Sequence, residues 1–569
     1  MAALLSCALV ASAHVPTAFR RAAAPRASPA LSSDREVDVV VIGSGVGGLS
    51  CAALLAKYGL DVLVLESHSI AGGCAHGFER GGFRFDSGPS LYNGMSQPST
   101  NPLRQVLDAV GEDVEWVRYD GWQMLLPGGR GFYFRTGSAD DWERTLREFG
   151  GPSALSDWAK LQAFCAPITA AASGIPPLTL RDDPGALIAI ALHGLRGFLA
   201  AAPVARLLTA PFSTTLAEAG VTDRFLLDWF DYLAFALSGL DAAGTLGAAV
   251  AYTMGDLHPR GALLDYPVGG SATLVDALVA GITKHGGEVR TGAHVERILI
   301  GGSGRAEGVA LRGGERVHAR RAIVSNAHVC STLALLPEHA RPPARPGSGG
   351  ALNGALEMTP SFMHLHLGIR SDGLDETVRA HSGGEPLRIH YSVVLDDFSD
   401  ILLPRNMVIV SFPTVLDRTL APPGHHVVHA YYAADEEYGA WEGLDRRSAE
   451  YAALKEERGA NLWRALERIV PDIRSRVVEE LVASPLTHER FLRRPRGTYG
   501  PTMFPADGSD VPWARTQIDG LLHCGDSCYP GIGLPAVAAS GAVAASTLVP
   551  LGRHLRLLSE MRAAGTLKP

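Results

Sequence analysis

Three features that would indicate other classes of protein are missing from this sequence, and the first is a basic surface. The chain has 569 residues and a formal net charge of −8, and its basic residues occur as scattered pairs such as Arg320-Arg321. Nucleic-acid-binding proteins need clustered positive charge to contact phosphates. The charge balance therefore excludes a nucleic-acid partner and favours a small-molecule substrate.

Metal-binding cysteine patterns are the second missing feature. The seven cysteines form no Cys-x-x-Cys pair, and no cysteine or histidine spacing suits zinc. This favours a reduced compartment and no metal. His364 and His366 lie two apart in a strand-like segment, and His425, His426 and His429 follow in another. Because no acidic or cysteine ligand accompanies them, we interpret them as sheet residues rather than a metal site.

A long apolar run is the third missing feature, since a membrane-spanning helix needs about 20 apolar residues. Residues 181–256 contain two apolar, helical stretches, but Arg196 and Arg206 interrupt the first, and Asp228 and Asp231 interrupt the second. Two interpretations remain, a buried helical subdomain and an amphipathic surface that dips into a bilayer to collect a lipid. Composition alone favours the buried subdomain.

The first 33 residues are a candidate targeting peptide, because they contain three arginines and no acidic residue. An apolar run at residues 2–13 ends in Ala-Ser-Ala, and Arg20, Arg21 and Arg26 follow among alanine, serine and proline. The first part resembles a secretory signal and the second a plastid transit peptide, as in the bipartite leaders of algae with secondary plastids. A plain chloroplast or mitochondrial transit peptide is the alternative.

A nucleotide site is predicted near the start of the remaining chain. Residues 39–42 form an apolar strand pattern, a turn with Gly43, Ser44, Gly45 and Gly48 follows, and residues 49–58 have a helical pattern. The glycines let a diphosphate approach the helix N-terminus. A second strand pattern at residues 61–65 ends in Glu66, the acid expected to hold ribose hydroxyls.

Two later segments are expected to join this site. The pair Gly72-Gly73 lets the backbone pass close to a bound cofactor. Residues 295–300 read as a strand, and residues 307–324 read as a hairpin that returns to the first sheet. We expect this return to place Val295 near the adenine.

A second motif faces the cofactor near the end of the chain. Residues 520–524 read as a strand that ends at Gly525 and Asp526, and a helix of small residues follows a glycine-rich turn. Asp526 is expected to accept a hydrogen bond from a ribityl or ribose hydroxyl. The turn with Gly533 and Leu534 offers N–H groups to the pyrimidine end of a flavin. Motifs at both ends of the chain indicate FAD rather than NAD.

The segments GSGVGGLSCAALLAKYGLDVLVLESHSIAGG, YPVGGSATLVDALV, LTHERFLRRPRGTYGP and CGDSCYPGIGLPAVAASGA together resemble the carotenoid isomerase and phytoene desaturase family of FAD-dependent oxidoreductases. Among its members, the plastid carotenoid isomerase branch is the most similar, and the resemblance covers residues 37–549. Family members commonly carry a basic residue soon after the glycine pair, but Cys74-Ala75 stand there in this chain. The flavin phosphates either lack that cation or take it from elsewhere.

The resemblance implies an FAD-dependent isomerase that converts cis double bonds of a prolycopene-type carotenoid to trans in plastid carotenoid biosynthesis. It implies a long hydrophobic tunnel and peripheral contact with the plastid membrane that holds the polyene. Desaturation, saturation of a retinoid or carotenoid, and hydration of a xanthophyll are alternatives on the same scaffold. A non-catalytic, flavin-binding carotenoid carrier is the alternative from another class. The electron donor or acceptor is open.

The catalytic candidates are Tyr499 and Cys528, with Arg496 and Tyr529 also expected beside the flavin ring. Tyr499 is either a general acid or a packing residue, and Cys528 is either reactive or an inert buried thiol.

The predicted fold is α/β, with a Rossmann-type FAD-binding domain assembled from residues 34–102, 265–345 and 510–552. A mixed α+β substrate domain comprises residues 103–180 and 346–509, and a helical subdomain comprises residues 181–264. Within the substrate domain, residues 441–480 have the pattern of one long amphipathic helix.

Overall fold

A mostly parallel sheet, assembled from three distant parts of the chain, carries the nucleotide motifs. The computed structural model describes residues 35–342, 357–501 and 512–568, so the predicted targeting peptide at 1–33 lies outside the described residues. The strand order of this sheet is β10-β2-β1-β13-β12-β11, and β19 pairs with β13. The strands are β1 (Arg35–Ile42), β2 (Val62–Leu65), β10 (Glu288–Arg290), β11 (Val295–Ile300), β12 (Ala306–Leu311), β13 (Arg316–Ser325) and β19 (Leu521–His523). The discontinuous, Rossmann-type α/β architecture predicted from the sequence is confirmed.

Parallel pairing explains why the cofactor motifs meet. β1 pairs in parallel with β2 and with β13, and β13 pairs in parallel with β19. The carboxyl ends of these strands therefore open at one edge of the sheet, where ligands of open α/β folds bind. The hairpin of β12 and β13 is antiparallel and returns the chain to the sheet, as predicted.

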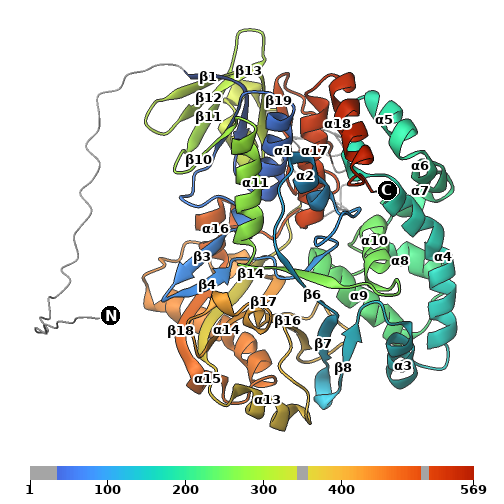
Figure 1. Ribbon diagram of the computed structural model, residues 1–569. Coiled ribbons are helices and arrows are strands. Elements are labelled where there is room, and N and C mark those ends of the chain that lie inside the picture. Colours follow the sequence, from blue (N-terminus) through green and yellow to red (C-terminus); the bar gives the residue numbers. More distant parts are fainter. Residues whose placement is uncertain (1–34, 343–356, 502–511, 569) are drawn as a thin grey trace, which may run out of the picture.

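Two helices from opposite ends of the chain pack directly against each other beside this sheet (Figure 1). They are α1 (Val46–Lys57) and α17 (Leu534–Thr547). A Cβ added to Gly541 would lie 2.1 Å from the backbone oxygen of Gly47, so the helices touch through backbone. The same face also carries α2 (Pro102–Val110), α11 (Ala272–Lys284) and α18 (Leu551–Ala563).

A second large sheet lies below the first in Figure 1, with the order β18-β14-β17-β16-β15-β7-β8. Its strands are β7 (Gly121–Leu125), β8 (Gly131–Arg135), β14 (Ser361–Arg370), β15 (His390–Val394), β16 (Met407–Ser411), β17 (His425–Glu436) and β18 (Val477–Ala483). Small sheets join the two halves: β3 (Gly77–Arg80) pairs with β4 (Phe83–Asp86), and β9 (Leu264–Pro267) pairs with β5 (Tyr92–Asn93) and β6 (Trp116–Tyr119).

The expectation of one helix over residues 441–480 was wrong. Helix α14 (Ala449–Glu467) ends before Pro471, and the chain continues as the short α15 (Ile473–Arg476) and then as β18. Proline lacks the N–H that a continuing helix needs, and it disfavours helical backbone at the residue before it. The charged stretch after the proline therefore forms an edge strand. Two further helices, α13 (Leu374–Ser382) and α16 (Pro485–Leu492), flank this sheet.

Helices cover the remaining side of the molecule, at the right in Figure 1. They are α3 (Ala139–Phe149), α4 (Ala154–Gly174), α5 (Gly185–His193), α6 (Leu195–Ala201), α7 (Ala205–Thr209), α8 (Phe212–Glu218), α9 (Arg224–Ser238) and α10 (Gly247–Leu257). α4 packs against α6 and α10, although the predicted boundaries assign it to the substrate domain. None of the helices in the described ranges combines the length and apolar character needed to cross a bilayer.

Candidate functional site

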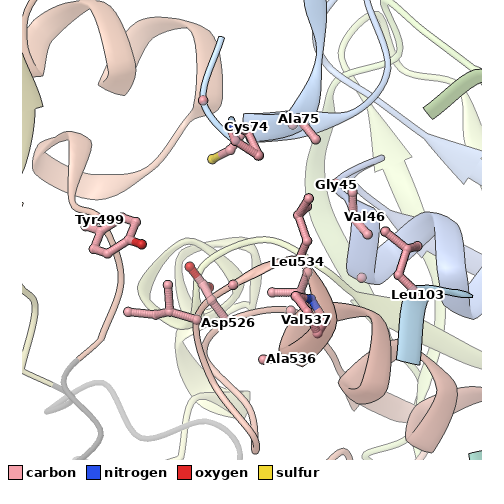
Figure 2. A pocket seen from close by; sticks show the side chains of 18 of the residues that line it. Gly45, Val46, Cys74, Ala75, Leu103, Tyr499, Asp526, Leu534, Ala536 and Val537 are labelled. Atoms are coloured by element: carbon pink, nitrogen blue, oxygen red, sulfur yellow. The ribbon is translucent and has the colours of Figure 1, made fainter. Parts of the chain in front are cut away.

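One cavity of about 980 Å³ runs from the edge of the first sheet, past the second sheet, into the helical subdomain. All predicted cofactor residues line it except Ser44 and Gly48; the lining members are Gly43, Gly45, Glu66, Gly72, Gly73, Val295, Gly525, Asp526, Gly533 and Leu534. Figure 2 shows residues of α1, of the segment after the glycine pair and of α17 around one space. The structure thus brings the predicted site residues together from three segments.

The helices α1 and α17 both begin at this cavity, and neither N-terminus is capped by a side chain. Gly45 precedes α1 and Gly533 precedes α17, and both are N-cap residues without a side-chain hydrogen bond. The N–H groups in a first helical turn have no partner within the helix, and the helix dipole adds partial positive charge there. The cavity therefore offers two places where backbone alone binds an anion or a polar ring edge.

The glycines of the first turn leave a cradle that side chains would fill. A Cβ on Gly45 would lie 2.6 Å from Asn326 Nδ2, and a Cβ on Gly48 would lie 2.4 Å from the backbone oxygen of Gly43. Gly73 lies against the same turn, since its Cβ would come within 3.0 Å of Gly45 Cα. Gly48 closes the turn from behind, whereas Gly45 and Gly73 keep its front open for the phosphates of a dinucleotide.

Glu66 lies at the adenosine end predicted from the sequence. Its Oε2 accepts hydrogen bonds from Ser44 N at 2.9 Å and Ser44 Oγ at 2.7 Å, and its Oε1 accepts one from His68 N at 2.7 Å. A carboxylate has about four acceptor positions, and the fourth holds only a long bond from Ser67 Oγ at 3.4 Å, which a ribose hydroxyl would replace. Val295 lines the cavity at the start of β11 beside His294, and its position near the adenine stays a prediction.

Asp526 follows β19 and forms an ion pair, with Arg494 Nη2 2.5 Å from its Oδ2. Burial raises the pKa of Asp526, but the charge of Arg494 more than offsets this, and the pKa lies below its usual value. The carboxylate is therefore ionised at neutral pH and is able to accept a hydrogen bond. Sequence reasoning missed Arg494 and placed Arg496 here, but Arg496 is exposed and does not line the cavity.

Tyr499 lines the cavity between the cofactor end and the helical subdomain. Its hydroxyl donates to the backbone oxygen of Leu237 at 3.2 Å, and its ring meets Phe362 edge-on with centroids 4.8 Å apart. Burial raises the pKa of Tyr499, so the phenol stays protonated.

Cys528 does not line the cavity, although Tyr529 does. The Cys528 thiol lies 3.0 Å from His523 Nδ1, and burial raises its pKa well above the usual value. A neutral, buried thiol of this kind is poorly reactive, which favours a structural role.

The far part of the cavity is mainly apolar, although its lining also includes the hydroxyl-bearing residues Tyr232, Ser238, Thr245, Tyr252 and Thr253. Helices α4, α7, α9 and α10 contribute Ala171, Leu208, Leu233, Ala236, Leu237, Ala249 and Leu257. Among the described lining residues, carboxylates and guanidinium groups occur only toward the cofactor end, at Glu66, Asp526, Arg493 and Arg494. Such a chamber suits a hydrocarbon chain and penalises a charged substrate.

Buried histidines stand beside the chamber on β14 and β17. Candidate ligand atoms of His364, His366 and His429 lie within 4.8 Å of one another. His364 Nδ1 and His429 Nε2 are 2.8 Å apart and share a hydrogen bond, and the rings of His366 and His429 are stacked at 7°. The lone pairs of a histidine lie in the plane of its ring, so the lone pairs of two parallel, stacked rings do not converge on one metal ion. All three histidines lie on strands of the second sheet, and the interpretation that they hold no metal stays a prediction.

The parallel sheet, the glycine cradle and the two open helix N-termini define a dinucleotide-binding oxidoreductase fold, and the residues present fit FAD. The model of the family described as flavin containing amine oxidoreductase matches residues 46–549. The chain belongs to this family, its cofactor is FAD, and it is an enzyme of the FAD-dependent oxidoreductase type.

Among proteins of known function, the chain is similar to prolycopene isomerases and to retinol reductases. The chain is 32% identical over 524 residues to the chloroplastic prolycopene isomerase of Daucus carota, covering 90% of this chain and 80% of that protein. It is 28% identical to the human all-trans-retinol 13,14-reductase, covering 82% of this chain and 77% of that protein. An oxidoreductase from Methanosarcina mazei shares the fold, with a TM-score of 0.57, 21% identity, and coverage of 88% and 98%.

Proposed function

We propose that this enzyme converts cis double bonds of a prolycopene-type carotenoid to trans, using FAD, in plastid carotenoid biosynthesis. One observation carries the proposal: a single cavity joins the FAD cradle to a chamber whose described lining has no charged side chain beyond the cofactor end. An elongated polyene has no polar group along its length, so such a chamber holds it by apolar contact alone. The similarity to prolycopene isomerases supports this choice of substrate.

The roles of the chain's own residues follow from their positions. The cradle around Gly45 and Gly73 holds the cofactor, while the apolar helices exclude water from the reacting double bond. Tyr499 stands where the two parts of the cavity meet and is proposed to orient the polyene with its ring. Reduced FAD, when bound, supplies the transient donation of charge that lowers the order of a cis double bond.

A membrane contact is proposed on the outer surface of α5 and α6, because large apolar side chains gather there. They are Leu187, Ile188, Leu192, Leu195, Phe198 and Leu199, and each is at least 44% exposed. α6 packs on α4, whose Ala171 lines the chamber. An interfacial helix pair at this place would bring a polyene from the bilayer directly to the cavity.

A plastid location is proposed from two sources. The first 33 residues have the composition of a targeting peptide, and the prolycopene isomerases of Daucus carota and Arabidopsis thaliana are chloroplastic. Expression of the full chain and of a chain lacking residues 1–33, each fused to a fluorescent protein, tests this in an algal cell. Plastid fluorescence from the full chain alone supports the proposal, and equal distribution of both contradicts it.

The reaction itself is tested by chromatography of products. Purified protein with FAD is incubated without oxygen, with and without dithionite, with poly-cis lycopene, all-trans lycopene or all-trans retinol. We expect poly-cis lycopene to become trans only when the flavin is reduced. A product that differs by two hydrogens would indicate a desaturase or a saturase, as in the retinol reductase relatives, and the absence of turnover would indicate a carrier.

A further inference from the structure

We propose that Arg494 supplies the positive charge of the FAD site in this chain, in the place of a basic residue after the glycine pair. The proposal concerns cofactor binding and is independent of the reaction that the enzyme catalyses. Cys74 and Ala75 follow Gly72-Gly73 in this chain. A dinucleotide brings a diphosphate with two negative charges to this loop, and here the loop itself offers no cation.

Arg494 lies beside the same loop, although it comes from a distant part of the chain. Its guanidinium charge acts on Cys74 and on Asp526, which places it between the segment after the glycine pair and the end of β19. Figure 2 shows Cys74, Tyr499 and Asp526 around this part of the cavity. The Arg494 side chain is only 14% exposed, so its charge is little screened by solvent.

Two backbone oxygens, the Asp526 carboxylate and the Cys74 side chain hold the guanidinium in place beside the loop. Nε donates to the backbone oxygen of Thr498 at 2.8 Å, and Nη2 donates to the backbone oxygen of Tyr499 at 2.6 Å and pairs with Asp526. These bonds to Thr498, Tyr499 and Asp526 do not use Nη1, and the neutral thiol of Cys74 is the remaining hydrogen-bond partner, which a phosphate oxygen would replace. A group fixed in this way is preorganised, so it binds an anion with little further loss of side-chain entropy.

Other cations do not compete for this role within the described part of the cavity wall. Arg493 is the one other arginine or lysine that lines the described wall. It is exposed, and its charge lowers the pKa of His294. Burial lowers the pKa of His328 to about 4, so this neighbour of Asp526 is neutral. Asp526 and Glu66 add negative charge to the site. Arg494 is therefore the one largely buried arginine or lysine on the described wall, and it offsets part of the negative charge that Asp526 and the phosphates bring together.

The test measures how fast the holoprotein releases FAD, from the fluorescence of the freed flavin. Arg494→Gln should release FAD at least about tenfold faster than wild type, because it loses a charge-assisted hydrogen bond to the cofactor. Arg494→Lys should be intermediate, because it keeps the charge and loses the fork geometry. Arg496→Gln, which alters the exposed arginine two residues away, should match wild type within about twofold.

A double variant distinguishes two roles of Arg494, binding of FAD and pairing with Asp526 alone. Arg494→Gln alone leaves the buried Asp526 carboxylate unpaired, and this could prevent folding. Arg494→Gln/Asp526→Asn removes both charges and therefore avoids that problem. The proposal predicts that this variant releases FAD at least about tenfold faster than Asp526→Asn alone. Equal release from these two variants, or release from Arg494→Gln within about twofold of wild type, would overturn it.

Discussion

The carboxylate of Glu66 accepts two hydrogen bonds from Ser44, one from its backbone N–H at 2.9 Å and one from its hydroxyl at 2.7 Å. Ser44 is buried and lies behind the glycine turn, so Glu66 ties the end of β2 to the start of α1. One residue thus fixes the shape of the turn and presents an acceptor to the cavity. Gly72 N also donates to Ser44 Oγ at 3.2 Å, so Ser44 links Glu66 to the glycine pair.

Gly45→Val should yield a folded but colourless protein. A Cβ at this position would lie 2.6 Å from Asn326 Nδ2, and the remaining valine atoms would fill the cradle in front of the turn. The measurement is the ratio of flavin absorbance to protein absorbance after purification. Gly302→Val is the control, because nothing lies within 4 Å of a Cβ there. Yellow Gly45→Val protein would contradict the placement of the phosphates.

Tyr499→Phe should keep turnover within about threefold of wild type, whereas Tyr499→Ala should lose most of it. The hydroxyl is engaged with the backbone oxygen of Leu237, and the ring contacts Phe362, so the ring is the part that shapes the cavity. Loss of a general acid typically costs about 10²–10⁴ in rate. A Tyr499→Phe enzyme as slow as Tyr499→Ala would show that the phenol donates a proton.

Stability should fall as the pH drops from about 7 to 5, because several buried histidines resist protonation. Burial lowers the pKa of His390 to about 3 and that of His366 to about 4, below the ordinary value of 6.5. The unfolded chain therefore binds more protons in this range, and stability that is full above pH 6.5 is lost on acidification. Buried carboxyls with raised pKa values, such as Asp256 at about 7, oppose the trend but are fewer.

Replacement of one such histidine measures how much that residue contributes to the pH dependence of stability. His390→Phe should reduce the loss of unfolding free energy between pH 7 and pH 5 by about 2 kcal/mol, measured by urea denaturation at both pH values. The control is His381→Phe, on the exposed surface of α13. An unchanged difference between the two pH values in His390→Phe would contradict the neutral, buried state of this ring.

Leu187→Glu/Leu199→Glu should weaken binding to phosphatidylcholine vesicles at least about tenfold, because each leucine buried in a bilayer contributes about 1.5 kcal/mol or more. Both side chains are 63% exposed on α5 and α6. Leu402→Glu is the matched control, since Leu402 is 47% exposed on a different part of the surface. Co-sedimentation measures the bound fraction. An equal loss in both proteins would remove α5 and α6 as the contact surface.

The nucleotide half of the site was predictable from sequence because its signals are local. The strand, turn and helix around Gly45 follow directly from periodicity and glycine spacing, and the acid at residue 66 follows the next strand. The convergence of Asp526 with this turn was inferable too, since a second strand and helix start of the same kind occur near the end of the chain.

The identity of the buried arginine was not predictable, for a geometric reason. Arg493 and Arg496 both adopt positive φ angles, 56° and 55°, so the backbone on both sides of Arg494 leaves the regular helix and strand conformations. Spacing along the sequence does not show which side chain of such a segment points inward. The end of α14 was missed for a simpler reason, because Pro471 is a stop signal that the charged pattern around it obscured.

The number of product molecules per electron pair tests the proposed isomerisation most directly. Holoprotein is reduced with a known, limiting amount of dithionite without oxygen, and excess poly-cis lycopene is added. The amount of each product is determined by chromatography and its molecular mass by mass spectrometry. We predict many trans molecules per electron pair, all with the mass of the substrate. One product per electron pair with a mass increase of two hydrogens would contradict isomerisation and indicate a saturase.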